Sequence, residues 1–279
     1  MKKSRIATII IGAVFLAGMS LLLYPTVSNL WNSYHQSRAI VDYTEQVGET
    51  SEETASRLWA DAVEYNAGLA ADADRFSMTD EKRKAYESQL NLSAGGVMGY
   101  LEIPRINCYL PIYHGTDSSA LQTGIGHLEG SSLPTGGKGT HCVLSGHRGL
   151  PSAKLLTDLD EMEVGDLFSL EVLDQTLTYE VDQIQTVDPY DLSALEIDPE
   201  KDYCTLVTCT PYGINTHRLL VRGHRVASLE TASADAMLAG KIRTIQVAAV
   251  VLPAAGAATL FFLIRLRRRR FRQDSGGDS

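Results

Sequence analysis

Two long apolar stretches, one near each end of this 279-residue sequence, restrict its fold more than any other feature. Ile6–Leu23 contains no charged residue and follows three basic residues, whereas Ile242–Ile264 contains a single charge, Arg243. Each stretch is long enough to cross about 30 Å of hydrocarbon as a helix. We therefore expect two membrane-spanning helices with a folded region between them.

The charges beside these stretches predict how the chain lies in the membrane. Basic residues precede the first stretch, and RLRRRRFR follows Ile264 directly. Because basic flanks stay on the cytoplasmic side, we expect both termini in the cytoplasm and residues 25–241 outside the cell. A signal peptide cleaved near Thr26–Ser28 is the alternative for the first stretch, although its long apolar run favours an uncleaved anchor.

The region between the two stretches changes character near residue 97. Apolar residues recur at helical spacing over residues 32–90, with Thr50 or Ser51 as N-cap candidates and a break at DADRFSMTD. From there to Leu229, short runs rich in Val, Ile, Leu, Tyr and Thr alternate with Gly and Pro. Seven or eight such runs predict a mainly β fold, a closed or nearly closed β-barrel preceded by helices.

These boundaries divide the chain into segments and place it in the cell membrane with the barrel outside the cell. The segments are a cytoplasmic N-terminus (1–5), a transmembrane anchor (6–24), a helical segment with a candidate lid (25–96), the β-barrel (97–230), a linker (231–241), a second transmembrane helix (242–264) and a basic cytoplasmic tail (265–279).

Charge and cysteine content exclude several functions for the outer region. Three of the 25 Lys and Arg residues precede residue 6 and six follow residue 264, which leaves 16 against 32 Asp and Glu. This acidic balance disfavours a nucleic-acid or anionic-lipid partner. The four cysteines are irregularly spaced and form no C-x-x-C pair. Neither a disulfide scaffold nor a structural zinc site is therefore expected.

Cys209 ends the predicted strand CTLVTC, directly before the loop TPYG. A strand end that opens into such a loop is where reactive groups are displayed on a rigid scaffold, whereas Cys204 at the strand start is expected to be buried. A thiol nucleophile needs a base to take its proton. Moving that proton to an unperturbed imidazole still costs about 2.7 kcal/mol. A neighbouring cation would lower this cost. Position alone leaves a reactive and a structural thiol equally open for Cys209.

Several histidines compete as the base. His224 lies on the strand after Cys209, but far from the Cys209 end if the two strands form a hairpin. His147 ends its own strand five residues after Cys142, just as Cys209 ends its strand five residues after Cys204. Two such strands would bring His147 and Cys209 together if they were parallel neighbours, which periodicity cannot establish.

Three motifs resemble those of one enzyme family. TLVTC, ending at Cys209, matches the T-L-x-T-C signature of sortases, the cysteine transpeptidases of Gram-positive bacterial surfaces. CTPYGINTHRLLVRGHR and LSGHRGLP are similar to the corresponding segments of class C sortases, which polymerise pilins. The resemblance covers residues 99–226. It implies that Cys209 is the nucleophile, His147 the general acid/base and Arg218 the group that steadies the substrate carbonyl.

The resemblance also implies a reaction and its partners. A class C sortase cleaves an LPxTG-like sorting signal between Thr and Gly and transfers the acyl group to a pilin lysine, which assembles covalent pili. This chemistry needs no metal ion or organic cofactor. Two alternatives stay open: a sortase that attaches surface proteins to peptidoglycan, and a non-catalytic surface scaffold on a sortase-like barrel. The two predicted membrane spans favour the pilin-polymerising class.

The same resemblance suggests that the break at DADRFSMTD is a lid over the active site. Class C sortases often carry a lid with an Asp-Pro-aromatic motif over the active site, and Asp74-Arg75-Phe76 is the nearest match. Arg75 replaces the proline that would fix φ, so such a lid is expected to be less rigid. Asp74 would then face the Cys209/Arg218 site and Phe76 would fill an apolar slot. An ordinary helix–helix loop is the alternative.

One pattern lies outside the family resemblance. If the strands that end at His147 and Cys209 are parallel neighbours, Cys142 and Cys204 lie level, within bridging distance. A disulfide and a pair of packed thiols are the two alternatives, and the packed thiols are favoured.

Overall fold

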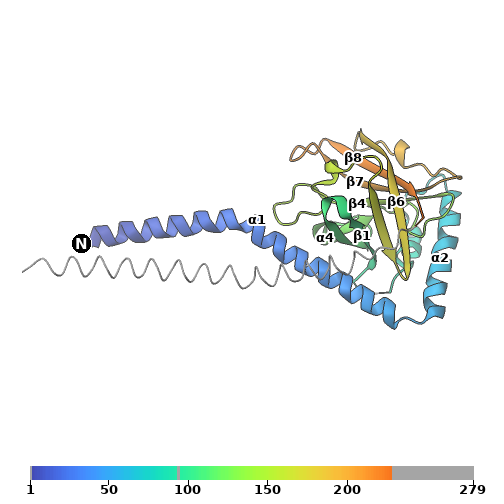
Figure 1. Ribbon diagram of the computed structural model, residues 1–279, viewed down its shortest axis with the longest axis horizontal. Helices are drawn as coiled ribbons and strands as arrows, with labels where there is room; N and C mark the ends of the chain where they lie inside the picture. The colour runs from blue at the N-terminus through green and yellow to red at the C-terminus, as the bar shows by residue number, and fades with distance from the viewer. Residues whose placement is uncertain (1, 93–94, 228–279) are drawn as a thin grey trace, which may run out of the picture. The chain divides into compact units, whose positions relative to one another are not determined.

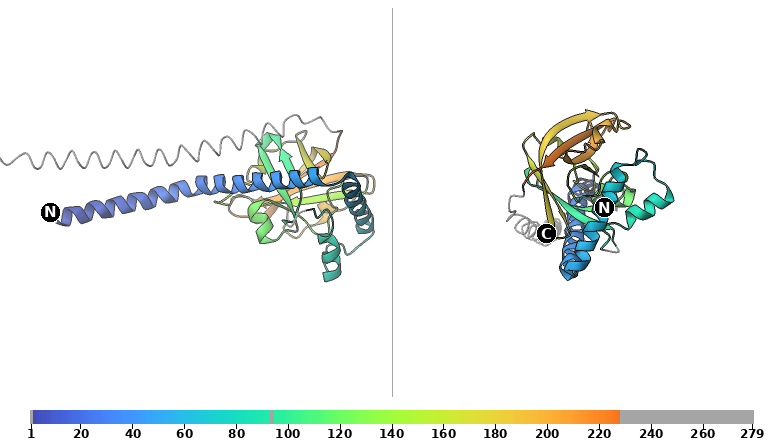
Figure 2. Two further views of the ribbon diagram at one scale, coloured as in Figure 1. Left: turned by 90° about the horizontal axis from the view of Figure 1, so that it is seen from below. Right: turned by 90° about the vertical axis from the view of Figure 1, so that its right-hand side faces the viewer.

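The computed structural model describes residues 2–92 and 95–227 (Figure 1). The predicted linker, second membrane span and basic tail, residues 231–279, lie outside the described residues. A long N-terminal helix and two shorter helices precede a β-barrel, and Figure 2 shows these helices against the barrel from two further sides.

The N-terminal helix α1 (Lys2–Glu49) is one continuous element that includes the first apolar stretch. In the described part of the chain, it is the one helix long and apolar enough to cross a membrane. Two predicted segments meet at Pro25, yet the helix runs through this residue. A proline removes one backbone hydrogen bond but has a helical φ, and such prolines are tolerated in membrane helices.

The second half of α1 packs against the barrel, whereas Leu22 in its apolar first half is exposed. The side chain of Tyr43 is buried. Its Oη donates a hydrogen bond to Met98 O (3.0 Å) and accepts one from Leu173 N (2.7 Å). This hydroxyl satisfies two backbone groups of the barrel and so fixes the helix to it.

The next two helices, α2 (Glu52–Ala70) and α3 (Asp80–Glu87), confirm the predicted helix pair and the break between them. Ser51 is the N-cap of α2, and its Oγ accepts a hydrogen bond from Thr54 N at 3.2 Å. Asn66 attaches α2 to the barrel, because its Oδ1 accepts a hydrogen bond from Leu133 N at 2.7 Å.

Eight strands form a closed barrel in the order β1-β2-β3-β4-β7-β8-β6-β5. The β2–β3 and β4–β7 pairs are parallel, and the other pairs are antiparallel. The predicted barrel is therefore confirmed. The strand that sequence patterns missed is β3, whose three residues are too few to show alternation. The strand bounds are β1 Val97–Ile103, β2 Cys108–His114, β3 Ile125–His127, β4 Thr140–Ser145, β5 Leu167–Val172, β6 Gln175–Val187, β7 Asp202–Thr210 and β8 His217–Arg225.

Short helices occupy four connections of the barrel. They are η1 (Pro104–Ile106), α4 (Ser118–Thr123), η2 (Leu159–Glu161) and η3 (Ser193–Leu195). The segment with η2 joins β4 to β5, and the segment with η3 joins β6 to β7.

The two faces of β7 contact different apolar clusters. Cys204 and Leu206 belong to the main core inside the barrel. Val207 points the other way and joins a smaller outer cluster, which includes Leu195 and Leu220. Because side chains alternate along a strand, Cys209 lies on the outer face with Val207.

The parallel pairing of β4 and β7, which sequence periodicity could not establish, is present. Cys142 is the register partner of Cys204, and Ser145 is the partner of Val207. β4 ends at Ser145, whereas β7 continues beyond Val207 to Thr210, so the two residues after Ser145 start level with the last part of β7.

Candidate active site

Cys209 and Arg218 are direct register partners on the antiparallel strands β7 and β8. Both side chains are half-buried. Directly opposite residues in an antiparallel pair share one face, with Cβ atoms about 4.5–5.5 Å apart. The fold therefore places a thiol and a guanidinium side by side at the end of β7.

His147 reaches the same rim from β4. The contact between β4 and β7 continues beyond the last ladder pair, because Gly146 N donates a hydrogen bond to Val207 O at 3.0 Å. The buried Thr208 then donates through Oγ1 to Gly146 O at 2.7 Å. These two bonds hold the residue directly before His147 against the residue directly before Cys209.

Arg148 makes a matching contact on the other side of His147. Its Nη1 donates to Thr210 Oγ1 at 3.3 Å, and its Nη2 forms an ion pair with Asp160. Only 9% of the Arg148 side chain is exposed, so this contact is sheltered from water. Its Nε has no partner within the described residues. The residues on either side of His147, Gly146 and Arg148, are thus hydrogen-bonded to the residues on either side of Cys209, Thr208 and Thr210.

The guanidinium of Arg218 is turned toward the loop that precedes β8. Its Nη1 donates to Asn215 O at 3.4 Å and to His217 O at 3.1 Å. Both acceptors are backbone carbonyls, and among the described residues no ion pair holds Arg218.

The other candidates on β8 lie away from the thiol. His224 is paired with Tyr203, near the opposite end of β7 from Cys209. Arg222 forms a two-bond ion pair with Asp182 (2.9 and 3.0 Å). The hairpin geometry that separates His224 from Cys209 is confirmed, and Arg222 has a structural partner.

Asp74, the first residue of the candidate lid, is exposed in the turn between α2 and α3. Its carbonyl oxygen accepts a hydrogen bond from Lys82 Nζ at 3.1 Å. Among the described residues, no hydrogen bond or ion pair joins Asp74 to Cys209 or Arg218.

Phe76, the last residue of the candidate lid, is half-buried in the outer cluster. Val207 in this cluster lies two residues before Cys209, and Leu220 lies two residues after Arg218. Because residues two apart on a strand share a face, Phe76 covers the face that carries the thiol and the guanidinium.

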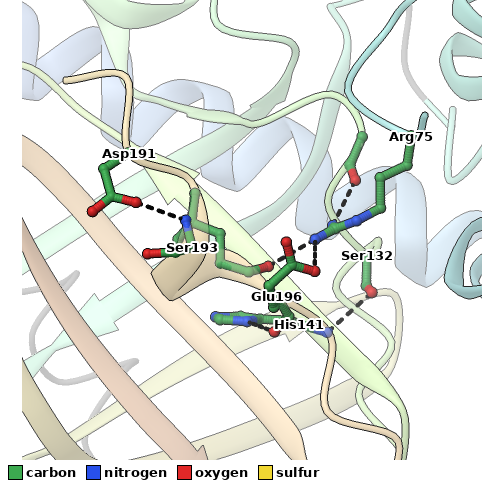
Figure 3. Close-up of polar contacts among 8 residues, drawn as sticks. Arg75, Ser132, His141, Asp191, Ser193 and Glu196 are labelled. Atoms are coloured by element: carbon green, nitrogen blue, oxygen red, sulfur yellow. Dashed lines mark hydrogen bonds and ion pairs between the residues drawn. The ribbon is translucent and has the colours of Figure 1, made fainter. Parts of the chain in front are cut away.

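Arg75 anchors this turn to two loops of the barrel (Figure 3). Its side chain is buried, and it donates hydrogen bonds to Gly130 O and to Leu195 O, both at 2.9 Å. Glu196 Oε2 lies 3.6 Å from its Nη2. Arg75 therefore supplies side-chain hydrogen bonds where a proline would supply a fixed φ.

His141 holds the β6–β7 connection from below, as Figure 3 shows. Its Nδ1 donates to Glu196 O (2.9 Å), so its Nε2 is the acceptor for Thr205 Oγ1 (2.7 Å). Burial lowers the pKa of His141 to about 4, although the bond to Glu196 O opposes that change. The imidazole is therefore neutral at physiological pH, and both of its nitrogens are engaged in hydrogen bonds.

Cys142 and Cys204 are free, buried thiols inside the barrel. Burial and the neighbouring Cys142 raise the pKa of the Cys204 thiol. A buried, protonated thiol is a poor nucleophile. Cys209 is the one cysteine of the four that is not buried. Over residues 2–92 and 95–227, no group of three or more His, Cys, Asp or Glu side chains is arranged to hold a metal ion.

A closed mixed barrel that gathers a cysteine, a histidine and an arginine at one rim has the parts of a cysteine acyl-transfer enzyme. The sortase domain family matches residues 101–226. The chain belongs to the sortase family, whose members are cysteine transpeptidases.

Solved class C sortases and a curated relative resemble the chain. The crystal structure of sortase C1 from Streptococcus agalactiae is 54% identical, with a TM-score of 0.67, and the match covers 69% of this chain and 100% of that one. Sortase C of Clostridium perfringens, solved with the C-terminal cell wall sorting motif, is 45% identical with a TM-score of 0.61, covering 68% of this chain and 99% of that one. Sortase D of Bacillus subtilis (strain 168) is 36% identical over 135 residues, which span 47% of this chain and 65% of that protein, just under two thirds of its length.

Sequence reasoning missed two residues that shape this rim, Thr208 and Arg148. Strand alternation in TLVTC places Thr208 on the inner face, so its burial could have been read from the sequence. Its acceptor could not, because the Gly146 carbonyl is 62 residues away. Arg148 gave no signal of its own beyond its place after His147.

Proposed function

We propose that this chain is a membrane-anchored sortase that cleaves an LPxTG-like sorting signal between Thr and Gly and transfers the acyl group to a pilin lysine. Cys209 is the nucleophile, His147 the general acid/base and Arg218 the donor to the substrate carbonyl. The observation that carries this proposal is the strand register, which pairs Cys209 with Arg218 and starts the His147 segment level with the end of β7.

The first half of the reaction forms a thioester. The Cys209 thiolate attacks the carbonyl carbon of the Thr in the sorting signal, and a C–S bond forms. His147, as imidazolium, gives its proton to the Gly nitrogen while the C–N bond breaks. Arg218 turns from Asn215 O and His217 O and donates to the oxyanion that develops on the Thr carbonyl.

The second half transfers the acyl group. The neutral His147 accepts a proton from the incoming lysine amine, which attacks the thioester carbon. The C–S bond breaks, the Cys209 thiolate is regenerated, and an isopeptide bond joins the two proteins. The same imidazole thus acts first as acid and then as base.

Two relationships support these partners. A solved sortase C that resembles this chain carries a C-terminal cell wall sorting motif, which favours a sorting signal as the donor. Several of the solved structures that resemble the chain are class C enzymes, which favours a pilin lysine over a peptidoglycan amine as the acceptor. A peptidoglycan-attaching sortase is the second candidate. Offering the acyl-enzyme a pilin lysine and a wall-peptide amine in competition separates the two.

The membrane arrangement is part of the proposal. The apolar first half of α1 is the anchor, and residues 242–264 form a second span, so both termini lie in the cytoplasm and the barrel lies outside the cell. The exposed apolar side chains of α1, such as Ile11 and Leu21, support the first span. The segment boundaries given above are the proposed division of the chain.

The turn that carries Asp74, Arg75 and Phe76 is proposed as a lid. The position of Phe76 on the Cys209 face supports this, because a substrate peptide that lies on β7 must displace its ring. Arg75 supports it too, since two hydrogen bonds to separate loops hold the turn in place.

The experiment that tests the function is detection of the acyl-enzyme. The full chain in lipid nanodiscs is incubated with an LPxTG-type peptide, and mass spectrometry locates the adduct. We expect an adduct on Cys209, none in Cys209→Ala, and an unchanged adduct in Cys204→Ala, which removes a buried thiol. An adduct that survives Cys209→Ala and disappears in Cys204→Ala would refute the assignment.

A further inference from the structure

The loop that follows His147 is bound to α1 close to its apolar stretch. Asn32 Nδ2 donates a hydrogen bond to Ser152 O at 2.7 Å, and Asn29 Oδ1 accepts one from Lys154 N at 2.8 Å. Asn29 and Asn32 are three residues apart and so share one side of the helix. This fixes the height of the 148–154 loop along α1.

That height can be compared with the dimensions of a membrane. The continuous apolar run of α1 ends at Leu23, and Asn29 lies six residues later, about 9 Å further along the helix at 1.5 Å per residue. The headgroup region extends roughly 5–8 Å beyond the hydrocarbon on each side of a bilayer. The 148–154 loop therefore lies at the outer edge of the headgroup region when the stretch spans the membrane.

Aromatic residues on α1 mark the same level. Tyr24, Trp31 and Tyr34 are 56%, 66% and 46% exposed, and Trp31 directly precedes Asn32. Tyr and Trp are enriched where a membrane helix passes through the interface. The exposed aromatic residues thus extend the interfacial zone to the turn of α1 that binds the loop.

The neighbouring loop at this rim, residues 211–216, exposes two apolar side chains. Tyr212 and Ile214 are 60% and 67% exposed. The Arg148 guanidinium lies 5.9 Å from the centre of the Tyr212 ring. A Cβ at Gly149 would come within 3.0 Å of that ring, so the two loops are packed together. The exposed pair lies beside the loop that α1 holds at the headgroup level.

We propose that Tyr212 and Ile214 contact the outer leaflet of the membrane, so that Cys209 works at the membrane surface. The proposal rests on α1 being the membrane anchor. The occupant of this rim is the outer-leaflet interface, from the headgroups to their boundary with the acyl chains, where an aromatic ring and an aliphatic side chain are favourable. The excess of acidic residues in the outer region favours zwitterionic over anionic lipid.

This placement has a consequence for the substrate. A donor that is held in the same bilayer by its own apolar segment, with its sorting signal directly outside that segment, meets Cys209 without leaving the membrane. Its effective concentration at the thiol is then much higher than that of a free peptide. Loss of a lipid contact at Ile214 should therefore slow adduct formation with a membrane-held donor and leave the rate with a free peptide unchanged.

Fluorescence quenching tests the contact without relying on catalysis. The two native tryptophans, Trp31 and Trp59, are replaced by Phe in the full chain, which is reconstituted into phosphatidylcholine vesicles with brominated acyl chains. Ile214→Trp then supplies one emitter at the rim. The matched control is Val63→Trp, an exposed position on α2. Helix α2 follows the C-terminal end of α1, and that end lies about 30 Å along α1 from Asn29.

We expect the emission of Ile214→Trp to be weaker in brominated than in ordinary lipid, and the emission of Val63→Trp to be the same in both. If the emission of Ile214→Trp is also the same in both lipids, the proposal is overturned. This result is independent of whether wild-type protein forms an adduct, so failure of the proposed reaction and failure of the lipid contact are distinguishable.

A rate comparison tests the consequence for the donor. Ile214→Asp should slow adduct formation with a sorting peptide that carries an apolar membrane segment and leave the rate with a soluble peptide unchanged. Equal slowing with both peptides would assign Ile214 to the peptide site and overturn the lipid assignment.

Discussion

Thr208 and Gly146, 62 residues apart in the sequence, are joined by a hydrogen bond of 2.7 Å from Thr208 Oγ1 to Gly146 O. One residue further along each segment lie Cys209 and His147. Arg148 and Thr210 form the next cross-link, at 3.3 Å. Thr208 and Thr210 share the face of β7 opposite Cys209, so the two cross-links position the proposed nucleophile and base without touching the substrate.

Thr208→Val should lower the rate of acyl-enzyme formation about tenfold or more, because small displacements of catalytic groups are costly. The variant leaves the buried Gly146 carbonyl without a donor, so the free energy of unfolding should fall by about 1–3 kcal/mol. Rate and Tm are measured together on the full chain. Thr44→Val, which removes a hydroxyl bonded to Ile40 O at an exposed position of α1, is the control and should change neither. A normal adduct rate in Thr208→Val would refute the positioning role.

Arg148→Gln should slow acyl-enzyme formation at Cys209 about tenfold or more, because it removes the cross-link to Thr210 Oγ1 that holds the His147 segment beside Cys209. Thr210→Val removes the other partner of the same hydrogen bond and should slow the reaction to a similar extent. In the double variant the effects should not add.

Arg105→Gln is the matched control for Arg148→Gln. Arg105 is an exposed arginine that pairs with Glu163 and Asp166, and among the described residues none of its hydrogen bonds or ion pairs involves the proposed catalytic residues. The rate of acyl-enzyme formation in Arg105→Gln should match the wild type. A wild-type rate in Arg148→Gln would mean that Arg148 does not position the site, whatever the effect of the substitution on Tm.

The sequence predicts most of the barrel because short runs rich in β-forming residues are separated by Gly and Pro. The run VMGYLEI, for example, corresponds to β1 over Val97–Ile103. It could not predict β3, which has three residues, or the uninterrupted path of α1 through Pro25. The first element is too short for a pattern, and the second depends on a helix environment that a local proline rule does not include.

The site follows a similar division. Their places at strand ends make Cys209 and His147 candidates, and the resemblance to sortases selects them, whereas the β4–β7 register that brings their strands level is visible only in the structure. Parallel strands are joined by long connections, so their pairing leaves no local mark in the sequence. The anchoring of Arg75 depends on Leu195 O, which is 120 residues distant, and could not be predicted from the turn that contains it.

His141 should make the protein less stable in mild acid. Burial lowers its pKa to about 4, below the value near 6.5 of an unfolded chain. The unfolded state therefore binds a proton first as pH falls. The part of the free energy of unfolding that depends on a neutral His141 is fully present above about pH 6.5 and is lost as pH falls toward 4. It totals about 3 kcal/mol.

The measurement is Tm at about pH 7 and about pH 5 for the wild type and His141→Gln. The variant should be less stable at neutral pH but should lose less on acidification, because it lacks the imidazole of His141, whereas His114, whose pKa burial also lowers, is common to both proteins. An identical drop in Tm for both proteins would assign the acid sensitivity to other groups.

The two inner cysteines should behave as thiols. Cys142 and Cys204 are register partners with free sulfhydryls inside the barrel. Thiol titration of the protein, denatured in the absence of reductant, should count all four cysteines. A count lower by two would mean that the pair is oxidised to a disulfide.

Opening the proposed lid should make Cys209 react faster. The other three cysteines are buried, so alkylation of the folded chain reports on Cys209. In the Asp74→Ala, Phe76→Ala double variant, the ring that covers the outer face beside Val207 is removed. Arg75→Ala should act in the same direction, since it removes both hydrogen bonds that hold the turn.

Arg38→Ala, which breaks an exposed ion pair with Asp42 on α1, is the control for these lid variants and should leave alkylation unchanged. The double variant keeps Arg75 and its two anchors, so it tests the cover itself. Arg75→Ala keeps Phe76, so it tests the attachment. If the thiol reacts at the wild-type rate in both, the turn is an ordinary connection between α2 and α3. Faster reaction in the double variant alone would mean that Phe76 covers the site while Arg75 holds only the neighbouring loops.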